Sequence, residues 1–200
     1  PSLESMTYDA TTALIVVDVQ NDFADPDGSL FVTDAPAAIP FISDQAHAAA
    51  EAGATIVYTQ DWHPPRTPHF ETDGGPWPVH CVADSWGARF HPDLAVVDEA
   101  VNLRKGTGGE DGYSAFSLRD PETGEETPTG LGDQLRDRGI DHVVVLGLAL
   151  DYCVKETALD AARLGFDTTL LADGTRPVNL EPGDGSRAVA ELVEAGVEVA

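Results

Sequence analysis

The stretch ALIVV at residues 13–17, followed directly by Asp18, decides the fold. It is a short apolar run rich in β-branched residues, which is typical of a strand buried on both faces of a parallel sheet. Similar runs follow along the chain: ATIVYT at 54–59, HVVVL at 142–146 and TTLL at 168–171, with weaker candidates at 101–103 and 197–199. We expect these segments to form one sheet.

Helical patterns separate the strands, at residues 37–52, 131–138, 153–164 and 186–194. Three of them are followed by Gly53, Gly139 and Gly165, which can adopt the left-handed conformation that closes a helix. Alternating strands and helices predict right-handed crossovers, and hence a doubly wound, mainly parallel, Rossmann-like α/β/α fold with helices on both faces. Ligands then bind at the carboxyl ends of the strands.

The 200 residues suit one domain, spanning 1–200. The chain has 35 acidic and 11 basic residues, a net charge of −24, and its lysines are Lys105 and Lys155. Such a surface repels phosphate backbones and anionic lipids, which argues against nucleic-acid and membrane partners. We interpret the acid excess as adaptation to a salty cytoplasm; an ordinary acidic protein is the alternative.

The sequence contains no apolar run near the roughly 20 residues that a membrane helix needs, and its first residues do not resemble a signal peptide. We therefore expect a cytoplasmic protein and leave open whether it forms a homo-oligomer. Two cysteines, Cys81 and Cys153, do not make a disulfide framework in a chain of this length, so each is judged as a thiol.

Two long segments without clear periodicity, 61–93 and 105–129, interrupt the alternation. Long loops in a compact domain are usually functional or disordered. We interpret the first, and the second as far as Phe116, as loops of a site. The remainder, RDPETGEETPTG at 119–130, reads as a solvated acidic excursion.

Reactive side chains follow the predicted strands. Asp18 ends the strand predicted at 13–17, and Asp61 lies just past the strand at 54–59. Cys153 lies after the strand at 142–146, where strand gives way to helix. A thiol at a helix amino terminus is favoured as thiolate, so Cys153 is the candidate nucleophile and Cys81 a buried small residue. Lys105 after a weak strand would stabilise both anions.

The first loop also carries a candidate metal set. Asp61, His63, His69 and His80 lie within twenty residues, and three of the six histidines of the chain are among them. Imidazoles and a carboxylate suit Zn²⁺, Fe²⁺ or Mn²⁺. The remaining histidines, including His47, are interpreted as structural.

These blocks resemble a known family, the cysteine amidohydrolases of the isochorismatase-like superfamily, and within it the nicotinamidases and pyrazinamidases. The matching blocks are ALIVVDVQNDF, TQDWHP, PHF, GPWPVHC, FHPDL, KGTGGEDGYSAF and GLALDYCV, over about residues 13–179. Isochorismate hydrolases proper lack the cysteine, so Cys153 argues against that assignment. The resemblance implies hydrolysis of nicotinamide to nicotinate and ammonia in NAD salvage, through a thioester.

The resemblance also implies roles. Asp18 is the general base, Lys105 its cationic partner and Cys153 the nucleophile. The metal ligands that the resemblance implies are Asp61, His63, His69 and His80. It also implies an oxyanion hole from the N–H groups of Ala149 and Cys153, with a cis peptide between Leu148 and Ala149. The implied ring pocket consists of Phe23, Trp77, Tyr113 and Tyr152. One divalent metal per chain is expected, with Zn²⁺ first and Fe²⁺ or Mn²⁺ as alternatives.

The chain departs from the family at Leu150, where the family has Thr before the Asp of the cysteine block. This puts the geometry of the turn in question without removing a reacting group. Three alternatives stay open: a related hydrolase of another small amide or ureide such as a carbamoyl compound or biuret, a hydrolase whose metal activates water while Cys153 is structural, and a non-catalytic module.

Overall fold

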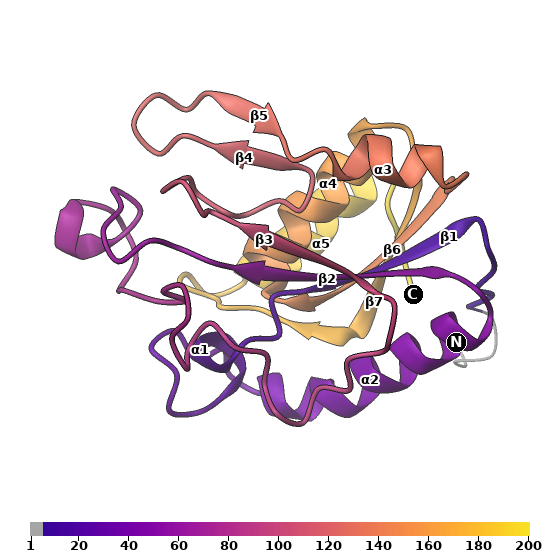
Figure 1. Ribbon diagram of the computed structural model, residues 1–200, viewed down its shortest axis with the longest axis horizontal. Helices are drawn as coiled ribbons and strands as arrows, with labels where there is room; N and C mark the ends of the chain where they lie inside the picture. Colours follow the sequence, from indigo (N-terminus) through magenta and orange to yellow (C-terminus); the bar gives the residue numbers. More distant parts are fainter. Residues whose placement is uncertain (1–5) are drawn as a thin grey trace.

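The computed structural model describes residues 6–200 and has a parallel sheet at its centre (Figure 1). Within these residues six strands pair in the order β3-β2-β1-β6-β7-β8, and every neighbouring pair is parallel. The strands are β1 Thr12–Val17, β2 Thr55–Asp61, β3 Val101–Lys105, β6 His142–Leu148, β7 Asp167–Arg176 and β8 Glu198–Val199. The chain starts at the centre and winds outward in both directions, which confirms the doubly wound α/β prediction.

Helices cover both faces of the sheet. Helices α1 and α2 lie on one face and α3, α4 and α5 on the other, with bounds α1 Asn21–Ala24, α2 Ala35–Glu51, α3 Leu131–Asp137, α4 Lys155–Arg163 and α5 Asp184–Glu194. Alternate residues of β1 point to opposite sides, so Leu14 and Val16 pack against α2 while Ile15 and Val17 pack against the other layer. No helix within the described range is long and apolar enough to cross a membrane.

The boundaries of the elements differ from the sequence patterns in ways that matter for the site. Strand β2 includes Asp61 and β3 includes Lys105, so these side chains end strands. The helix expected at 153–164 begins with a π-helical turn, η2 Leu150–Val154, before α4. Cys153 therefore lies in a widened turn between β6 and α4.

The capping prediction for three glycines is confirmed. Gly53, Gly139 and Gly165 follow their helices with φ of 80°, 76° and 90°. The acidic segment 119–130 is mostly exposed, as expected of a solvated excursion, and it contains an element that the sequence did not predict. Part of it belongs to a two-stranded antiparallel hairpin of β4 Ser117–Arg119 and β5 Glu126–Pro128, in which β5 is exposed along its length.

Candidate active site and metal centre

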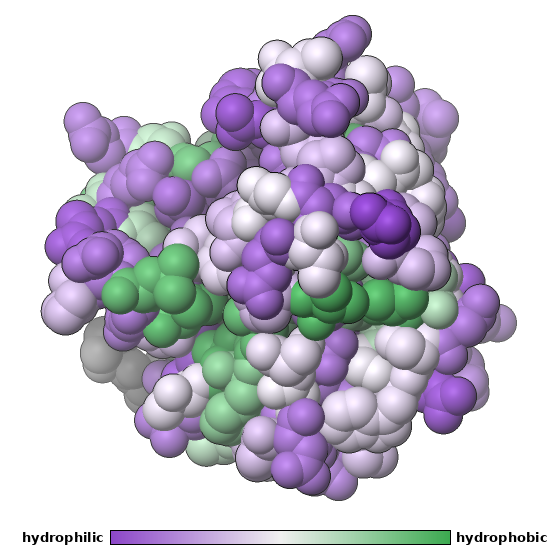
Figure 2. Space-filling model, turned by 90° about the vertical axis from the view of Figure 1, so that its left-hand side faces the viewer, coloured by the Kyte–Doolittle hydropathy of each residue, from purple (hydrophilic) through white to green (hydrophobic). Residues whose placement is uncertain are grey.

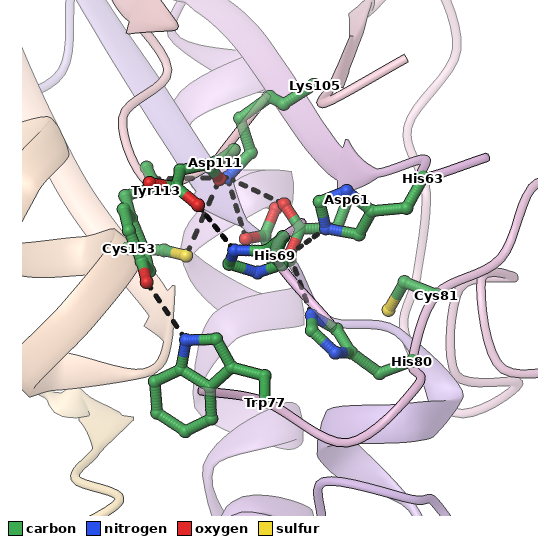
Figure 3. A network of polar contacts seen from close by, with 12 residues as sticks. Asp61, His63, His69, Trp77, His80, Cys81, Lys105, Asp111, Tyr113 and Cys153 are labelled. Carbon is green, nitrogen blue, oxygen red and sulfur yellow. Dashed lines mark hydrogen bonds and ion pairs between the residues drawn. The ribbon is translucent and has the colours of Figure 1, made fainter. Parts of the chain in front are cut away.

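The candidate catalytic residues meet at the carboxyl ends of four adjacent strands. Asp18 follows β1, Asp61 and Lys105 are the last residues of β2 and β3, and Cys153 lies in η2 after β6. Adjacent parallel strands end at the same edge of the sheet, so their last side chains converge. Atoms of Asp18, Asp61 and Cys153 lie within 4.8 Å of one another (Figure 3 shows Asp61, Lys105 and Cys153).

Lys105 is the charged centre of this group. Its fully buried ammonium donates to Asp18 Oδ2 at 2.8 Å and lies 3.2 Å from Asp61 Oδ1. It also donates to the backbone carbonyls of Gly112 and Tyr113. Burial acts to lower the pKa of Lys105, but the two carboxylates outweigh it and raise that pKa. The lysine therefore stays charged between two acids.

Asp18 leaves β1 with a left-handed φ of 50° and is fully buried. Thr59 Oγ1 donates to Asp18 Oδ1 at 2.6 Å. Burial raises the pKa of Asp18 to about 6, with Lys105 opposing the rise and Asp61 adding to it. A carboxylate whose pKa lies near neutrality is suited to general acid-base work, because it can both take and return a proton.

Cys153 is 7% exposed, and its Sγ lies 3.7 Å from the Gly112 carbonyl oxygen. Burial raises the pKa of the Cys153 thiol well above its usual range; Lys105 opposes this, and Asp18 and Asp61 add to it. This differs from the expectation of a thiolate favoured by a helix amino terminus, because a dry site beside two carboxylates penalises another negative charge. The resting thiol needs a base, and Asp18 is adjacent.

Three histidines form a second cluster beside the carboxylates. Ring nitrogens of His63, His69 and His80 lie within 4.8 Å of one another (Figure 3). Asp61 Oδ2 is 3.6 Å from His63 Nε2 and 3.8 Å from His80 Nε2. The backbone N–H of His63 donates to the carbonyl of Cys81 at 2.9 Å. The long proline-rich loop thus folds back and places His80 next to His63.

The cluster fits a divalent transition metal. Both ring nitrogens of His63 are buried and have no hydrogen-bond partner among the described residues. Buried polar atoms are normally paired, so such unpartnered atoms call for a ligand. Burial acts to raise the pKa of Asp61, but the Lys105 ammonium and the neighbouring imidazoles of His63 and His80 hold that pKa well below its usual range. A carboxylate with three imidazoles is a donor set that Zn²⁺, Fe²⁺ or Mn²⁺ accepts.

One pocket connects the thiol with the histidines. Its lining contains the four expected aromatic residues and several apolar side chains that the sequence did not single out, together with polar residues of the two clusters. The lining residues are Phe23, Leu30, Val32, Asp61, His69, Trp77, His80, Tyr113, Leu148, Ala149, Tyr152, Cys153 and Val178. Trp77 Nε1 donates to the Tyr113 hydroxyl at 2.9 Å, and the Trp77 and Tyr152 rings meet edge to face with centroids 4.9 Å apart.

The face over the carboxyl ends of the strands is apolar at its centre. Figure 2 shows hydrophobic residues across the middle of this face with hydrophilic residues around them.

The turn before Cys153 has the expected backbone. The Leu148–Ala149 peptide is cis, and Ala149 and Cys153 both line the pocket. Leu150, which replaces the family Thr, is buried in the apolar cluster under α3, α4 and α5. Its side chain thus serves packing, and the reacting groups stay together.

Three polar residues of the site had no signal that singled them out. Thr59 binds Asp18, as described above. Gln20 is fully buried; its Nε2 donates to the Asp61 carbonyl at 2.8 Å, and its Oε1 accepts the Asp61 N–H at 2.9 Å. Asp111 Oδ1 lies 2.5 Å from His69 Nδ1. Gln20 and Asp111 lie inside the DVQ and GGEDGY blocks, where their positions beside Asp18 and Lys105 were the available hint.

The residues assigned to structural roles have other partners or are exposed. Cys81 is fully buried, and its Sγ lies 3.8 Å from the carbonyl oxygen of Gly87. His47 is exposed on α2, and His142 pairs with Thr169 Oγ1.

Comparison with known proteins shows the family of this chain. The isochorismatase domain model matches residues 12–200. The nicotinamidase/pyrazinamidase of Mycobacterium tuberculosis is 41% identical over 193 residues, covering 94% of this chain and 97% of the relative.

Two solved structures have the same fold. The pyrazinamidase of Pyrococcus horikoshii in complex with zinc matches with a TM-score of 0.84 and 38% identity, covering 95% of this chain and 98% of the other. PnC1 of L. infantum in complex with nicotinate matches with a TM-score of 0.88 and 38% identity, covering 98% of this chain and 95% of the other.

Proposed function

Because this chain belongs to the isochorismatase domain family and is an amidohydrolase, we propose that it hydrolyses nicotinamide to nicotinate and ammonia, a step of NAD salvage. The single observation that carries this proposal is the shared pocket, whose lining includes both the Cys153 thiol and the rings of His69 and His80. A small aromatic amide can therefore present its carboxamide to the thiol and its ring nitrogen to the histidine cluster.

The chemistry follows from the electrostatics of the catalytic group. Asp18, whose pKa is about 6, takes the thiol proton of Cys153, and the sulfur attacks the amide carbon. The N–H groups of Ala149 and Cys153 stabilise the oxyanion, a contribution of about 3 kcal/mol per donor. As the C–N bond breaks, protonated Asp18 gives its proton to the departing amide nitrogen, which leaves as ammonia. Water, with Asp18 again as base, hydrolyses the thioester and releases the acid and the thiol.

Lys105 orients the two carboxylates of the catalytic group. Its ammonium binds Asp18 and Asp61 together, so that two carboxylates can coexist in a buried site. It also favours negative charge on Cys153 while the thiol proton is on Asp18. The carbonyls of Gly112 and Tyr113 fix the direction of the ammonium.

We assign one divalent metal per chain to the histidine cluster, held by Asp61, His63, His69 and His80, with zinc the first candidate and Fe²⁺ or Mn²⁺ the alternatives. When bound, it supplies a site for the pyridine nitrogen and so orients the ring. The aromatic side chains Phe23, Trp77, Tyr113 and Tyr152 enclose the ring between apolar surfaces.

The lining of the pocket favours an aromatic amide over a ureide or biuret. Apart from the catalytic group and the histidine cluster, the described lining is apolar or aromatic and contains no lysine or arginine. Extended polar substrates have several donors and acceptors that need partners when buried. A nicotinamide ring needs one, at its nitrogen.

The test incubates the metal-loaded protein separately with nicotinamide, benzamide and biuret and measures the ammonia released. It distinguishes hydrolysis of an aromatic amide from hydrolysis of a ureide or biuret. Benzamide has the same shape as nicotinamide but lacks the ring nitrogen, so we expect its kcat/KM to be lower by about 10-fold or more, as for one lost interaction. Release of ammonia from biuret but not from nicotinamide contradicts the proposal. Alkylation of Cys153 with retained turnover would point instead to a metal-activated water.

A further inference from the structure

Asp111 binds the ring nitrogen of His69 that is turned away from the metal position. His69 Nδ1 and Asp111 Oδ1 are 2.5 Å apart, and their side chains are 3% and 14% exposed. With Nδ1 engaged, Nε2 is the nitrogen that His69 has left for a metal. Asp111 itself is not among the proposed ligands.

We propose that Asp111 is a positioning residue of the metal centre: its carboxylate accepts the Nδ1 proton of His69 and thereby fixes the tautomer and the direction of Nε2. The inference rests on the proposed metal centre and extends it to a residue outside the ligand set. Metal-bound histidines commonly donate their second N–H to a carboxylate, which also makes the ligating nitrogen more basic.

The three histidines are held in different ways, which makes the contribution of Asp111 separable. His80 Nδ1 lies 2.8 Å from the backbone carbonyl of Pro78, and neither ring nitrogen of His63 has a partner among the described residues. Within the same part of the chain, His69 is the histidine of the cluster whose second nitrogen meets a carboxylate outside the ligand set. Changing Asp111 therefore alters one ligand and leaves the other two untouched.

The position of Asp111 does not depend on its contact with His69. Its backbone N–H donates to the carbonyl of Arg119 on β4 at 2.8 Å. The next residue, Gly112, is closely surrounded, since a Cβ there would lie 2.9 Å from Asp61 Oδ1 and 3.2 Å from the Lys105 Cβ. The carboxylate is thus presented to His69 by a segment that the hairpin and the catalytic group already hold.

The same short segment serves both centres. The carbonyls of Gly112 and Tyr113 hold the Lys105 ammonium, and Asp111 holds His69. A metal ligand and the catalytic lysine are therefore oriented from consecutive residues, which couples the geometry of the two sites.

The test measures zinc affinity directly. Metal-free wild type, Asp111→Ala, Asp111→Asn and the neighbouring control Glu110→Gln compete for Zn²⁺ with a chromogenic chelator. The Glu110→Gln control removes the same charge one residue away. The Glu110 carboxylate accepts the N–H of Gly108 and does not bind a histidine, so this substitution leaves His69 unchanged. We expect Asp111→Ala to raise the zinc Kd by about 10- to 100-fold, Asp111→Asn to raise it less because its oxygen still accepts the proton, and the control to stay near wild type.

A spectroscopic reading separates positioning from general destabilisation. At saturating Co²⁺, the visible absorption bands of Asp111→Ala should differ from those of wild type, since the direction of one imidazole has changed. Equal zinc affinity and an equal cobalt spectrum in Asp111→Ala and wild type overturn the inference, and so does an equal loss in Glu110→Gln. If Asp111→Ala does not fold, Asp111→Asn decides: affinity below wild type supports the inference and unchanged affinity overturns it. Wild-type protein that binds no metal refutes the metal centre itself.

Discussion

The molecule has two buried cysteines that look alike by burial and differ in what their side chains reach. Burial raises the pKa of the thiol well above its usual range in both Cys81 and Cys153. Cys153 lines the pocket, its sulfur lies within 4.8 Å of a carboxylate oxygen of Asp18, and the charge of Lys105 acts on its pKa. The Cys81 sulfur lies near the carbonyl of Gly87, and Cys81 is not among the described residues that line the pocket. A perturbed thiol pKa alone therefore does not mark a nucleophile, whereas access to substrate together with an adjacent base does.

Cys81 contributes to the site through its backbone. Its N–H donates to Asp22 Oδ2 at 2.7 Å, and its carbonyl accepts the N–H of His63 at 2.9 Å. These bonds hold the strand-like contact that brings His63 and His80 together, and they do not involve the sulfur. One cysteine thus acts through its side chain and the other through its main chain.

The largest expected effect tests this contrast directly. Cys153→Ala should lower turnover of nicotinamide by about 10⁴-fold or more, as the loss of a nucleophile does in comparable hydrolases. Cys81→Ala keeps both backbone hydrogen bonds and should retain nearly full activity. The measurement is ammonia release by the two folded variants. Similar losses in both would remove the distinction between the thiols.

The histidine that Cys81 supports provides the next test. His63→Ala removes a ligand from a closed cluster, so the protein should lose both its bound metal, about one equivalent per chain, and its nicotinamide turnover. Elemental analysis and ammonia release measure the two effects, and His47→Ala on the exposed side of α2 is the control. Normal turnover by a metal-free His63→Ala protein contradicts the ligand set.

The base beside Cys153 is expected to matter somewhat less than the nucleophile. Asp18→Asn has the shape of the aspartate but keeps only one of the two oxygens that accept from Thr59 and Lys105, and it cannot take the thiol proton, so kcat should fall by about 10²- to 10⁴-fold. Melting temperatures close to wild type would show that the loss is chemical. Full activity of this variant would leave Cys153 without a base and weaken the contrast with Cys81.

The positive charge of Lys105 lies near Cys153 and acts to lower the pKa of that thiol, which is a further difference from Cys81. Lys105→Ala leaves Asp18 and Asp61 buried without their cation, which should cost about 3 kcal/mol or more of unfolding free energy. Activity should fall by about 10²-fold. Urea titration and ammonia release measure these effects, with Lys155→Ala on the surface of α4 as the control. Unchanged activity would reduce Lys105 to a structural cation.

The smallest effect concerns the net charge of −24, which bears on the whole fold and not on either thiol. The screening length falls from ~10 Å at 0.1 M salt to ~3 Å at 1 M, so repulsion among surface carboxylates weakens as salt is added. The melting temperature should rise with KCl into the molar range, while the activity ratio of Cys153→Ala to Cys81→Ala stays constant. A melting temperature that is flat above ~0.15 M supports an ordinary acidic protein.

The sequence predicted the sheet because buried parallel strands are short apolar runs, and β1 and β6 are almost continuous ones. It predicted the convergence of Asp18, Asp61 and Cys153 because parallel strands end at one edge. It missed the widened turn at Cys153, since local patterns do not distinguish a π turn from the first turn of a helix. The partnership of Asp111 with His69 was also invisible, because it joins residues 42 apart through the tertiary fold.

The ordered hairpin of β4 and β5 was missed for a related reason. Its two strands have only three residues each, too few for the alternation by which a half-buried strand is recognised. The raised pKa of the Cys153 thiol was missed because it depends first on burial in the folded chain and then on the carboxylates of Asp18 and Asp61, which only the tertiary fold brings near it.

Gln20 substitutes for a peptide unit. The main chain turns away from the sheet at Asp18, where φ is positive, while β2 continues to Asp61. The side-chain amide of Gln20 has the planar donor and acceptor of a peptide group, and it pairs with both the N–H and the carbonyl of Asp61. The ladder between the first two strands is thereby extended by a side chain after the backbone has left it. This mimicry frees Asp18 to face Lys105 and Thr59, since the neighbouring strand keeps its hydrogen bonds without it.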